Sequence, residues 1–259
     1  MIIDTHAHYD DEQFDPDRKE LLLSMEAQGV EAIINIGSDY RSLERILRLT
    51  EEFPFLYGAM GVHPDAVGEL TEERFARLEA YVQHPKVVAV GEIGLDYHWN
   101  VEGKETQKHW MIRQLELARR QQLPVVIHSR DAAADTMEIM KRHGQGMKAV
   151  IHCYSYGREQ AEEYVRMGYQ IGIGGVLTFK NARKLKETAA VIPLERILLE
   201  TDAPYLAPEP FRGKRNNSLY IYYVAEALAQ IKGISAEAVL RQTRENARQF
   251  YGKIPGNQI

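Results

Sequence analysis

The chain alternates eight short apolar runs with amphipathic stretches along nearly its whole length. Each run is rich in Val, Ile, Leu or Ala and ends near Gly, His, Asp or Pro, which is typical of a buried strand. The expected strands cover residues 1–6, 32–37, 56–61, 87–92, 124–128, 148–152, 169–173 and 196–202. The expected helices cover residues 17–28, 39–51, 71–83, 105–121, 131–143, 157–167, 180–190, 218–231 and 235–250. Strands that alternate with helices indicate an α/β protein with a parallel sheet.

The number of these units favours a closed (β/α)8 TIM barrel over an open sheet. A doubly wound open sheet shows the same alternation and is the alternative fold. The chain has 259 residues, a length that such barrels commonly use as one domain. It shows neither a low-complexity linker nor a break in composition, so we expect a single domain over residues 1–259.

The charge balance limits the kinds of partner that this chain can bind. It carries 32 basic and 37 acidic residues, a formal net charge of -5, so any phosphate binding must be local rather than due to bulk charge. A single cysteine, Cys153, excludes an internal disulfide. The first residues lack the basic segment of a secretory leader, and no later stretch is apolar enough to span a membrane. We therefore expect a cytoplasmic protein that does not contact membranes.

Polar side chains of the kinds that bind metals close most of the expected strands. In a TIM barrel the functional residues lie at the carboxyl ends of the strands. Six residues of this kind stand at such ends, namely His6, His8, Glu92, His128, His152 and Asp202. Chance placement would scatter them over helices and loops, so this pattern predicts a metal site at one end of the barrel.

The spacing of His6 and His8 supports that prediction independently. Side chains at positions i and i+2 of a strand share a face and lie about 6–7 Å apart along it, so both imidazoles can converge on one ion. Imidazoles suit Zn, Mn, Fe, Co or Ni better than Mg or Ca, although the mixed N and O set does not choose among Zn, Mn, Mg, Ni, Co and Fe. The alternative is a pair of hydrogen-bonded core histidines.

Six ligands are more than one catalytic zinc uses, and they suit two divalent ions about 3.5–4 Å apart. Glu92 is the expected bridge between the ions, and Asp202 the expected ligand that also accepts a proton from the bridging water. Two deeper carboxylates follow from the same alternation, Asp4 below His6 and Glu200 below Asp202. We expect them to orient ligand histidines or buried water, and the alternative is a strand-end salt bridge.

The ordered motifs resemble those of the TatD family of metal-dependent deoxyribonucleases, within the amidohydrolase superfamily. They cover nearly the whole chain: Asp4-Thr-His6-Ala-His8, Gly61-Val-His63-Pro64, Gly91-Glu92-Ile-Gly-Leu-Asp96-Tyr97, His128-Ser-Arg130, His152-Cys153, Glu200-Thr-Asp202-Ala-Pro204-Tyr-Leu-Ala-Pro208 and Arg212-Gly-Lys214-Arg-Asn216. The resemblance implies a TIM barrel, a metal site at the six residues named above, and phosphodiester hydrolysis, often from DNA 3′ ends. One departure is that Asn217-Ser218 stands where the family usually has Glu-Pro. This change is expected to affect substrate preference more than metal binding.

Substrate contacts are expected from a proline-rich loop and from three further strand-end residues. The loop 203–217 carries Arg212, Lys214 and Arg215, and the helix expected from residue 218 would add N-terminal amides that suit an anion. The strand-end residues are His63, Arg130 and Tyr154. For these three the alternatives are a turn before Pro64, a salt bridge of Arg130 to Asp131 or Asp135, and a cover over the barrel mouth.

We therefore expect a two-metal deoxyribonuclease, a 3′–5′ exonuclease acting on single-stranded DNA ends, with no obligate protein partner. The first alternative is a metal-dependent hydrolase of esters or amides, including aminoacyl-tRNA. The second is a metal-binding or nucleic-acid-binding module without catalysis.

Overall fold

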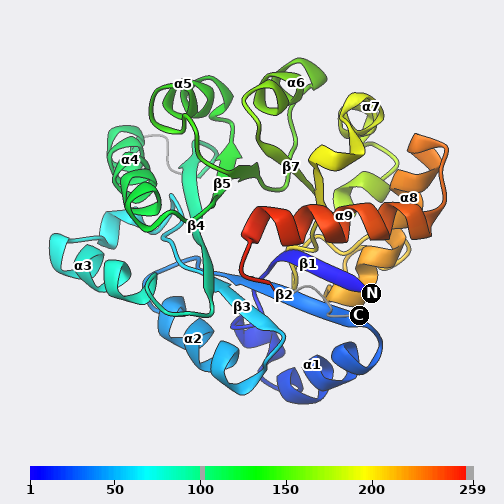
Figure 1. Ribbon diagram of the computed structural model, residues 1–259, viewed down its shortest axis with the longest axis horizontal. Coiled ribbons are helices and arrows are strands. Elements are labelled where there is room, and N and C mark those ends of the chain that lie inside the picture. Colours follow the sequence, from blue (N-terminus) through cyan, green and yellow to red (C-terminus); the bar gives the residue numbers. More distant parts are fainter. Residues whose placement is uncertain (100–102, 255–259) are drawn as a thin grey trace. The chain divides into compact units, whose positions relative to one another are not determined.

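The computed structural model describes residues 1–99 and 103–254, and it confirms the alternation of strands and helices (Figure 1). The strands are β1 (Ile2–Ala7), β2 (Val30–Ile36), β3 (Leu56–Ala59), β4 (Val87–Asp96), β5 (Val125–Arg130), β6 (Ala149–Ile151), β7 (Gln170–Ile173) and β8 (Ile197–Leu199). The α-helices are α1 (Arg18–Ala27), α2 (Ser42–Glu52), α3 (Glu72–Tyr81), α4 (Lys104–Gln121), α5 (Ala133–His143), α6 (Arg158–Arg166), α7 (Arg183–Val191), α8 (Ile221–Lys232) and α9 (Ala236–Tyr251). Short 3₁₀ helices are η1 (Glu12–Phe14), η2 (Val67–Glu69), η3 (Gly175–Thr178), η4 (Leu194–Arg196) and η5 (Ser218–Tyr220).

The chain forms two compact units, and the first joins its beginning to its end. It comprises residues 1–35 and those from 153 onward. In it β1 pairs in parallel with β2, and β7 with β8. The chain beyond β8 lies beside β1, because Ala7 and Ala203 form a parallel bridge and the His8 amide donates to the Ala203 carbonyl at 2.7 Å. The last strand therefore neighbours the first, as a closed barrel requires and an open doubly wound sheet does not.

The second unit, residues 36–152, contains a run of four parallel strands. Its β4 continues to Asp96, although the sequence predicted an end near Glu92. Gly94 has φ +151°, and a Cβ at that position would lie 1.9 Å from the His128 carbonyl oxygen. The absent side chain lets β4 stay paired with β5 past Glu92, and the expected strand end was wrong for this reason.

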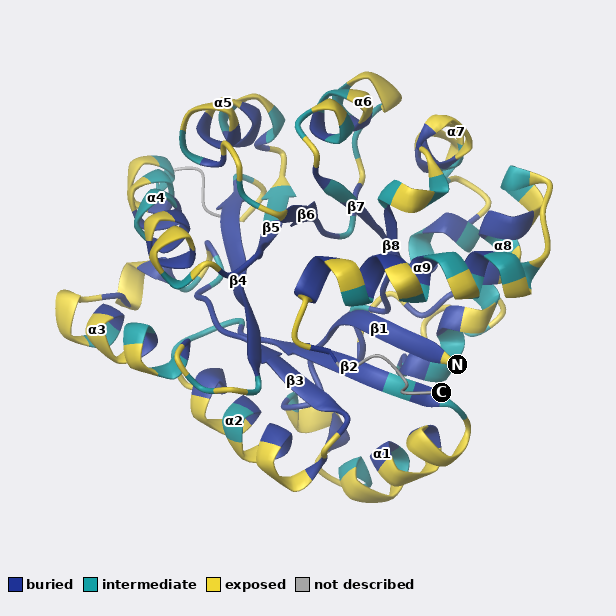
Figure 2. Cartoon of the chain, in the orientation of Figure 1, coloured by how far each residue is buried: buried dark blue, intermediate teal, exposed yellow. Residues whose placement is uncertain are grey.

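Most strand residues are buried and appear dark blue in Figure 2, whereas the helices carry both buried and exposed residues. All ten residues of β4 are buried. In α2 the buried apolar residues are Leu43, Ile46 and Leu49, spaced three apart, as expected of a helix with one apolar face. None of the helices in the described part of the chain combines the length and the apolar run needed to cross a bilayer.

Candidate metal site

His6, His8 and Asp202 form a compact cluster in the first unit. The Nε2 atoms of the two histidines are 3.2 Å apart, and Asp202 Oδ1 lies 3.6 Å from the first and 3.3 Å from the second. The backbone fixes the carboxylate beside the rings, since the Asp202 amide donates to the His6 carbonyl at 2.9 Å. His6 is fully buried and His8 nearly so, whereas 19% of the Asp202 side chain is exposed.

The spacing of these three atoms matches a metal ion of the first transition series. Two ligand atoms that each lie about 2.1 Å from one tetrahedral ion are about 3.4 Å from each other. The three observed edges of 3.2, 3.3 and 3.6 Å scatter around that value. Two imidazole nitrogens and one carboxylate oxygen are also donors that such ions accept. The residues present therefore fit one divalent ion.

A second cluster, in the other unit, is centred on Glu92. Its Oε2 lies 2.9 Å from His152 Nε2 and 3.5 Å from His128 Nδ1. Atoms of Glu92, His128 and His63 also lie within 4.8 Å of one another, and the rings of His63 and His128 pack edge to face at 4.3 Å. The structure therefore places His63, expected only as a substrate contact, directly against predicted ligands.

Two members of this cluster, Glu92 and His63, have pKa values that suit metal binding. Burial alone would raise the pKa of Glu92, but His152, His63 and His128 outweigh it and hold that pKa well below its usual value. Burial lowers the pKa of His63 to about 4, so its imidazole is neutral at pH 7. An ionised carboxylate and a neutral imidazole are the forms that bind metals.

Asp96 is a functional candidate to which the sequence assigned no role. Its Oδ2 lies 3.1 Å from Nε2 of His128, whose other nitrogen faces Glu92, so the carboxylate orients the ring. Burial would raise the pKa of Asp96, but bonds with His128 and with the amides of His98 and Trp99 lower it to about 2. Burial would also lower the pKa of His128, which its carboxylate partners nevertheless raise. The alternation of side chains along the strand could have revealed this role, because residues 92, 94 and 96 share one face of β4. That inference requires knowing that the strand extends to Asp96.

Asp4 is fully buried on β1, two residues before His6, and its partners are hydroxyls and amides. Its Oδ2 accepts hydrogen bonds from Thr201 Oγ1 and Ser218 Oγ, both at 2.6 Å. Its Oδ1 accepts from the amides of Thr201 and His6 at 3.1 and 3.3 Å. Burial raises the pKa of Asp4 to about 7 despite these bonds. The carboxyl thus fixes the backbone that carries His6, and among the described residues it forms no salt bridge.

Glu200, the other expected deep carboxylate, accepts a hydrogen bond from the Cys153 amide at 2.5 Å through Oε1. Gly172 leaves room for it, because a Cβ there would lie 2.4 Å from Glu200 Oε2. Glu200 therefore holds the backbone of Cys153 within the first unit.

The departure at Asn217-Ser218 has a structural role in this chain. Asn217 caps η5 by accepting the Leu219 amide at 3.0 Å. Ser218 is fully buried and contacts the Tyr9 hydroxyl at 2.9 Å, in addition to Asp4. The serine hydroxyl therefore connects the loop 203–217 to Asp4 and Tyr9. A proline side chain has no hydroxyl and could not form these bonds.

Three of the expected substrate contacts have exposed side chains. Arg130, Arg212 and Lys214 are exposed, and Arg212 lies over the Phe179 ring at 4.3 Å. The alternative for Arg130 was a salt bridge to Asp131 or Asp135. The structure argues against it, because Asp131 contacts His98 and Asp135 contacts Lys108.

Two further residues of the loop and the strand ends, Arg215 and Tyr154, are held by other parts of the protein. Arg215 is held by Asp17 in a two-pronged ion pair at 2.8 and 2.5 Å. Tyr154 is 2% exposed and its hydroxyl donates to the Gly157 carbonyl at 2.6 Å. Tyr154 therefore fits the alternative of a covering residue.

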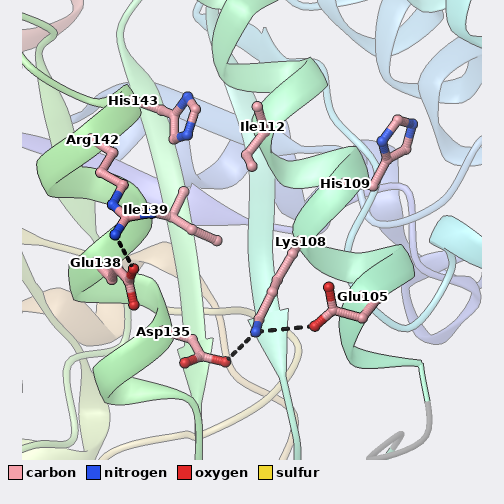
Figure 3. Close-up of a pocket in the computed structure, with 9 residues that line it drawn as sticks. All are labelled: Glu105, Lys108, His109, Ile112, Asp135, Glu138, Ile139, Arg142 and His143. Atoms are coloured by element: carbon pink, nitrogen blue, oxygen red, sulfur yellow. Dashed lines mark hydrogen bonds and ion pairs between the residues drawn. The ribbon is translucent and has the colours of Figure 1, made fainter.

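A pocket of about 370 Å³ between α4 and α5 contains histidines but lacks comparable chemistry (Figure 3). The Lys108 ammonium lies between Glu105 and Asp135, and Arg142 pairs with Glu138 (Figure 3). Each of these charged side chains is thus engaged in an ion pair, and we do not consider the pocket a catalytic site.

Comparisons with known proteins test the resemblance of this sequence to the TatD family. The family described as TatD related DNase matches residues 3–252. The chain is 42% identical to the uncharacterized metal-dependent hydrolase YabD of Bacillus subtilis, over 97% of this chain and 99% of that protein. The crystal structure of YjjV, a TatD homolog from Escherichia coli, superposes with a TM-score of 0.91 at 33% identity, covering 97% of this chain and 98% of that one. A TatD family hydrolase from Entamoeba histolytica gives a TM-score of 0.88 at 26% identity, covering 96% and 97%.

These similarities confirm the predicted fold class, a barrel of eight parallel strands with surrounding helices. The predicted extent of one domain over residues 1–259 stays a prediction. The predicted family is also confirmed, because the match spans almost the whole chain and every motif that suggested it. The chain therefore belongs to the TatD-related DNase family of metal-dependent hydrolases.

Proposed function

We propose that this chain hydrolyses phosphodiester bonds of DNA with divalent ions held by the two clusters. The observation that carries the proposal is the triangle of His6, His8 and Asp202, whose edges of 3.2 to 3.6 Å fit one ion. Glu92, His128 and His152 supply a second set of donors. Six such donors exceed the needs of one catalytic ion and support a two-metal enzyme.

The residues divide the chemical work in this proposal. Bound divalent ions would lower the pKa of water and stabilise the charge that develops on the phosphoryl group. Asp202 turns Oδ1 toward the two imidazoles, and its partial exposure suits a carboxylate that accepts the proton of the attacking water. Asp96 keeps the ring of His128 oriented, and Asp4 fixes the backbone beside His6.

The choice of DNA as substrate rests on two supports. The family description names a DNase. Exposed Arg212 and Lys214 offer cations to a phosphate backbone, although the net charge of the chain is negative. Single-stranded 3′ ends as the substrate, a 3′–5′ polarity and a cytoplasmic location belong to the same proposal.

A nuclease assay with metal analysis tests the proposal. The purified protein, loaded with Mn²⁺ or Mg²⁺, is incubated with 3′-labelled single-stranded DNA, and we expect labelled mononucleotides that disappear when EDTA is added. Asp202→Asn should lower kcat by about 10²- to 10⁴-fold, since it removes the proton acceptor and a charged ligand. Glu26→Gln changes an exposed carboxylate on α1 in the same way and should leave the rate unchanged.

Two outcomes would overturn the proposal. Hydrolysis of carboxylic esters, amides or aminoacyl-tRNA without release of mononucleotides would show a different hydrolase on the same donor set. Bound metal without any hydrolysis would show a binding module.

A further inference from the structure

Trp99 is the most exposed large apolar side chain in the described part of the chain. It is 69% exposed, whereas Trp110, the other tryptophan, is 7% exposed. A free indole is costly in water, because Trp carries one of the largest apolar surfaces of any side chain. Such exposure next to a functional site is typical of a side chain that becomes covered when a ligand binds.

Neighbouring residues hold this indole in place. The Arg130 guanidinium lies over the ring at 5.5 Å, and the His98 ring packs edge-on against it at 4.6 Å. His98 Nδ1 in turn lies 3.1 Å from Asp131 Oδ2. We call His98, Trp99 and Arg130 the Trp99 platform. It presents a large apolar surface together with a cation.

The platform is connected to the Glu92 cluster through one carboxylate. Asp96 Oδ1 accepts hydrogen bonds from the amides of His98 at 2.8 Å and Trp99 at 3.3 Å. Its other oxygen, Oδ2, faces His128 Nε2 at 3.1 Å. The platform therefore stands at the end of β4, one side chain away from a proposed metal ligand, within the same unit.

We propose that the Trp99 platform stacks a nucleobase of a single-stranded nucleic acid whose phosphate lies at the Glu92 cluster. Stacking on aromatic side chains accepts any base, and an adjacent arginine favours the negatively charged strand. This inference rests on the proposed function, and it adds a binding site for the base to the metal chemistry at the phosphate. The position of Arg130 favours a nucleic acid over an uncharged apolar partner.

Tryptophan fluorescence tests stacking without depending on catalysis. The metal-loaded protein is titrated with single-stranded DNA whose phosphorothioate linkages resist cleavage. We expect quenching in the wild type and in Trp110→Phe, which leaves Trp99 as the only indole, and no quenching in Trp99→Phe. An abasic strand of the same length, which keeps the charge but has no bases, should not quench.

Affinity and kinetics provide the second arm of the test. Trp99→Ala keeps the backbone bonds to Asp96 and should weaken binding of the normal strand by about 5- to 150-fold, whereas Trp99→Phe should largely restore it. With cleavable DNA, Trp99→Ala should raise KM and leave kcat nearly unchanged. Binding of the abasic strand should be equal in the wild type and in Trp99→Ala.

The outcomes separate this proposal from the proposed function. Cleavage of DNA with unchanged KM in Trp99→Ala, or equal quenching by normal and abasic strands, would overturn the platform and leave the nuclease standing. Base-dependent quenching without cleavage would support the platform and overturn the nuclease. Neither quenching nor cleavage would overturn both.

Discussion

At the scale of single residues, Asp4 shows how one carboxyl joins distant parts of the first unit. It accepts hydrogen bonds from Thr201 and Ser218, which are 197 and 214 positions away in the chain. The bonds that it accepts from the amides of His6 and Thr201 position the backbone at His6 and next to Asp202. Burial raises its pKa to about 7, so at neutral pH the group is close to its titration point.

Asp4→Asn is expected to change how stability depends on pH. The folded pKa, about 7, exceeds the unfolded value of 3.8, so folded protein binds an extra proton between these values. The proton linkage therefore stabilises the fold below about pH 4 and is lost as pH rises through 7, by up to about 4 kcal/mol. Asparagine cannot ionise, so urea unfolding of metal-free protein at pH 5 and pH 8 should differ less in the variant. Parallel stability profiles for the two proteins would contradict this account.

The sequence predicted some of these residue positions and missed others for a physical reason. The shared face of His6, on β1, and His8, one residue beyond its end, depends only on local alternation of side chains, so it could be predicted. The bond between Ser218 and Asp4 depends on how the chain returns after β8, which no local pattern encodes. The role of Asp96 was hidden because the expected strand ended four residues too early.

At the scale of elements, β4 carries both Glu92 and Asp96 because, after a register shift between Val90 and Ile93, it stays paired with β5 from Ile93 to Asp96. Gly94 makes this pairing possible. Its φ of +151° is rarely adopted by other residues, and the backbone of His128 occupies the space of a side chain. The identity of residue 94 thus determines where two predicted ligands and Asp96 stand.

Gly94→Ala is therefore expected to be strongly destabilising. A Cβ placed 1.9 Å from the His128 carbonyl must push β4 and β5 apart, which should cost more than about 3 kcal/mol of the free energy of unfolding. The matched control is Gly68→Ala in η2, where a Cβ meets nothing within 4 Å. Denaturant unfolding should show the control within about 0.5 kcal/mol of the wild type. Equal stability of the two variants would refute the steric explanation.

Element type was easier to predict than element boundaries. Periodicity alone identified all eight strands and nine α-helices found in the described residues, because each buries one face. The end of β4 could not be predicted, since it depends on close contact with β5 at Gly94 and not on any apolar pattern.

At the scale of the whole molecule, the beginning and the end of the chain share one unit. The Ala7–Ala203 bridge places Asp202 beside His6 and His8, although nearly two hundred residues separate them. The sequence predicted this neighbourhood only through the fold, since closing a barrel brings the last strand to the first. The amino-acid composition carries no information about this proximity of Asp202 to His6 and His8.

Metal removal is expected to lower the stability of the whole molecule. Each ion that binds only the folded state adds about 2.7 kcal/mol at a concentration 100 times its Kd, which corresponds to roughly 5–10 °C in Tm per ion for a chain of this size. Thermal unfolding with Mn²⁺ or Zn²⁺, compared with EDTA, should show this gain. Metal analysis should give two ions per chain.

His8→Ala and His109→Ala together show whether this gain comes from the predicted ligands. His8 belongs to the triangle with His6 and Asp202, so its loss should reduce the bound metal to about one ion and remove much of the gain in Tm. His109 is an exposed histidine beside the pocket between α4 and α5, so its replacement should leave both quantities as in the wild type. If His8→Ala kept two ions and the full gain while His109→Ala lost either, the metals would bind elsewhere. The triangle would then be a hydrogen-bonded group of core histidines, which is the alternative that the sequence left open.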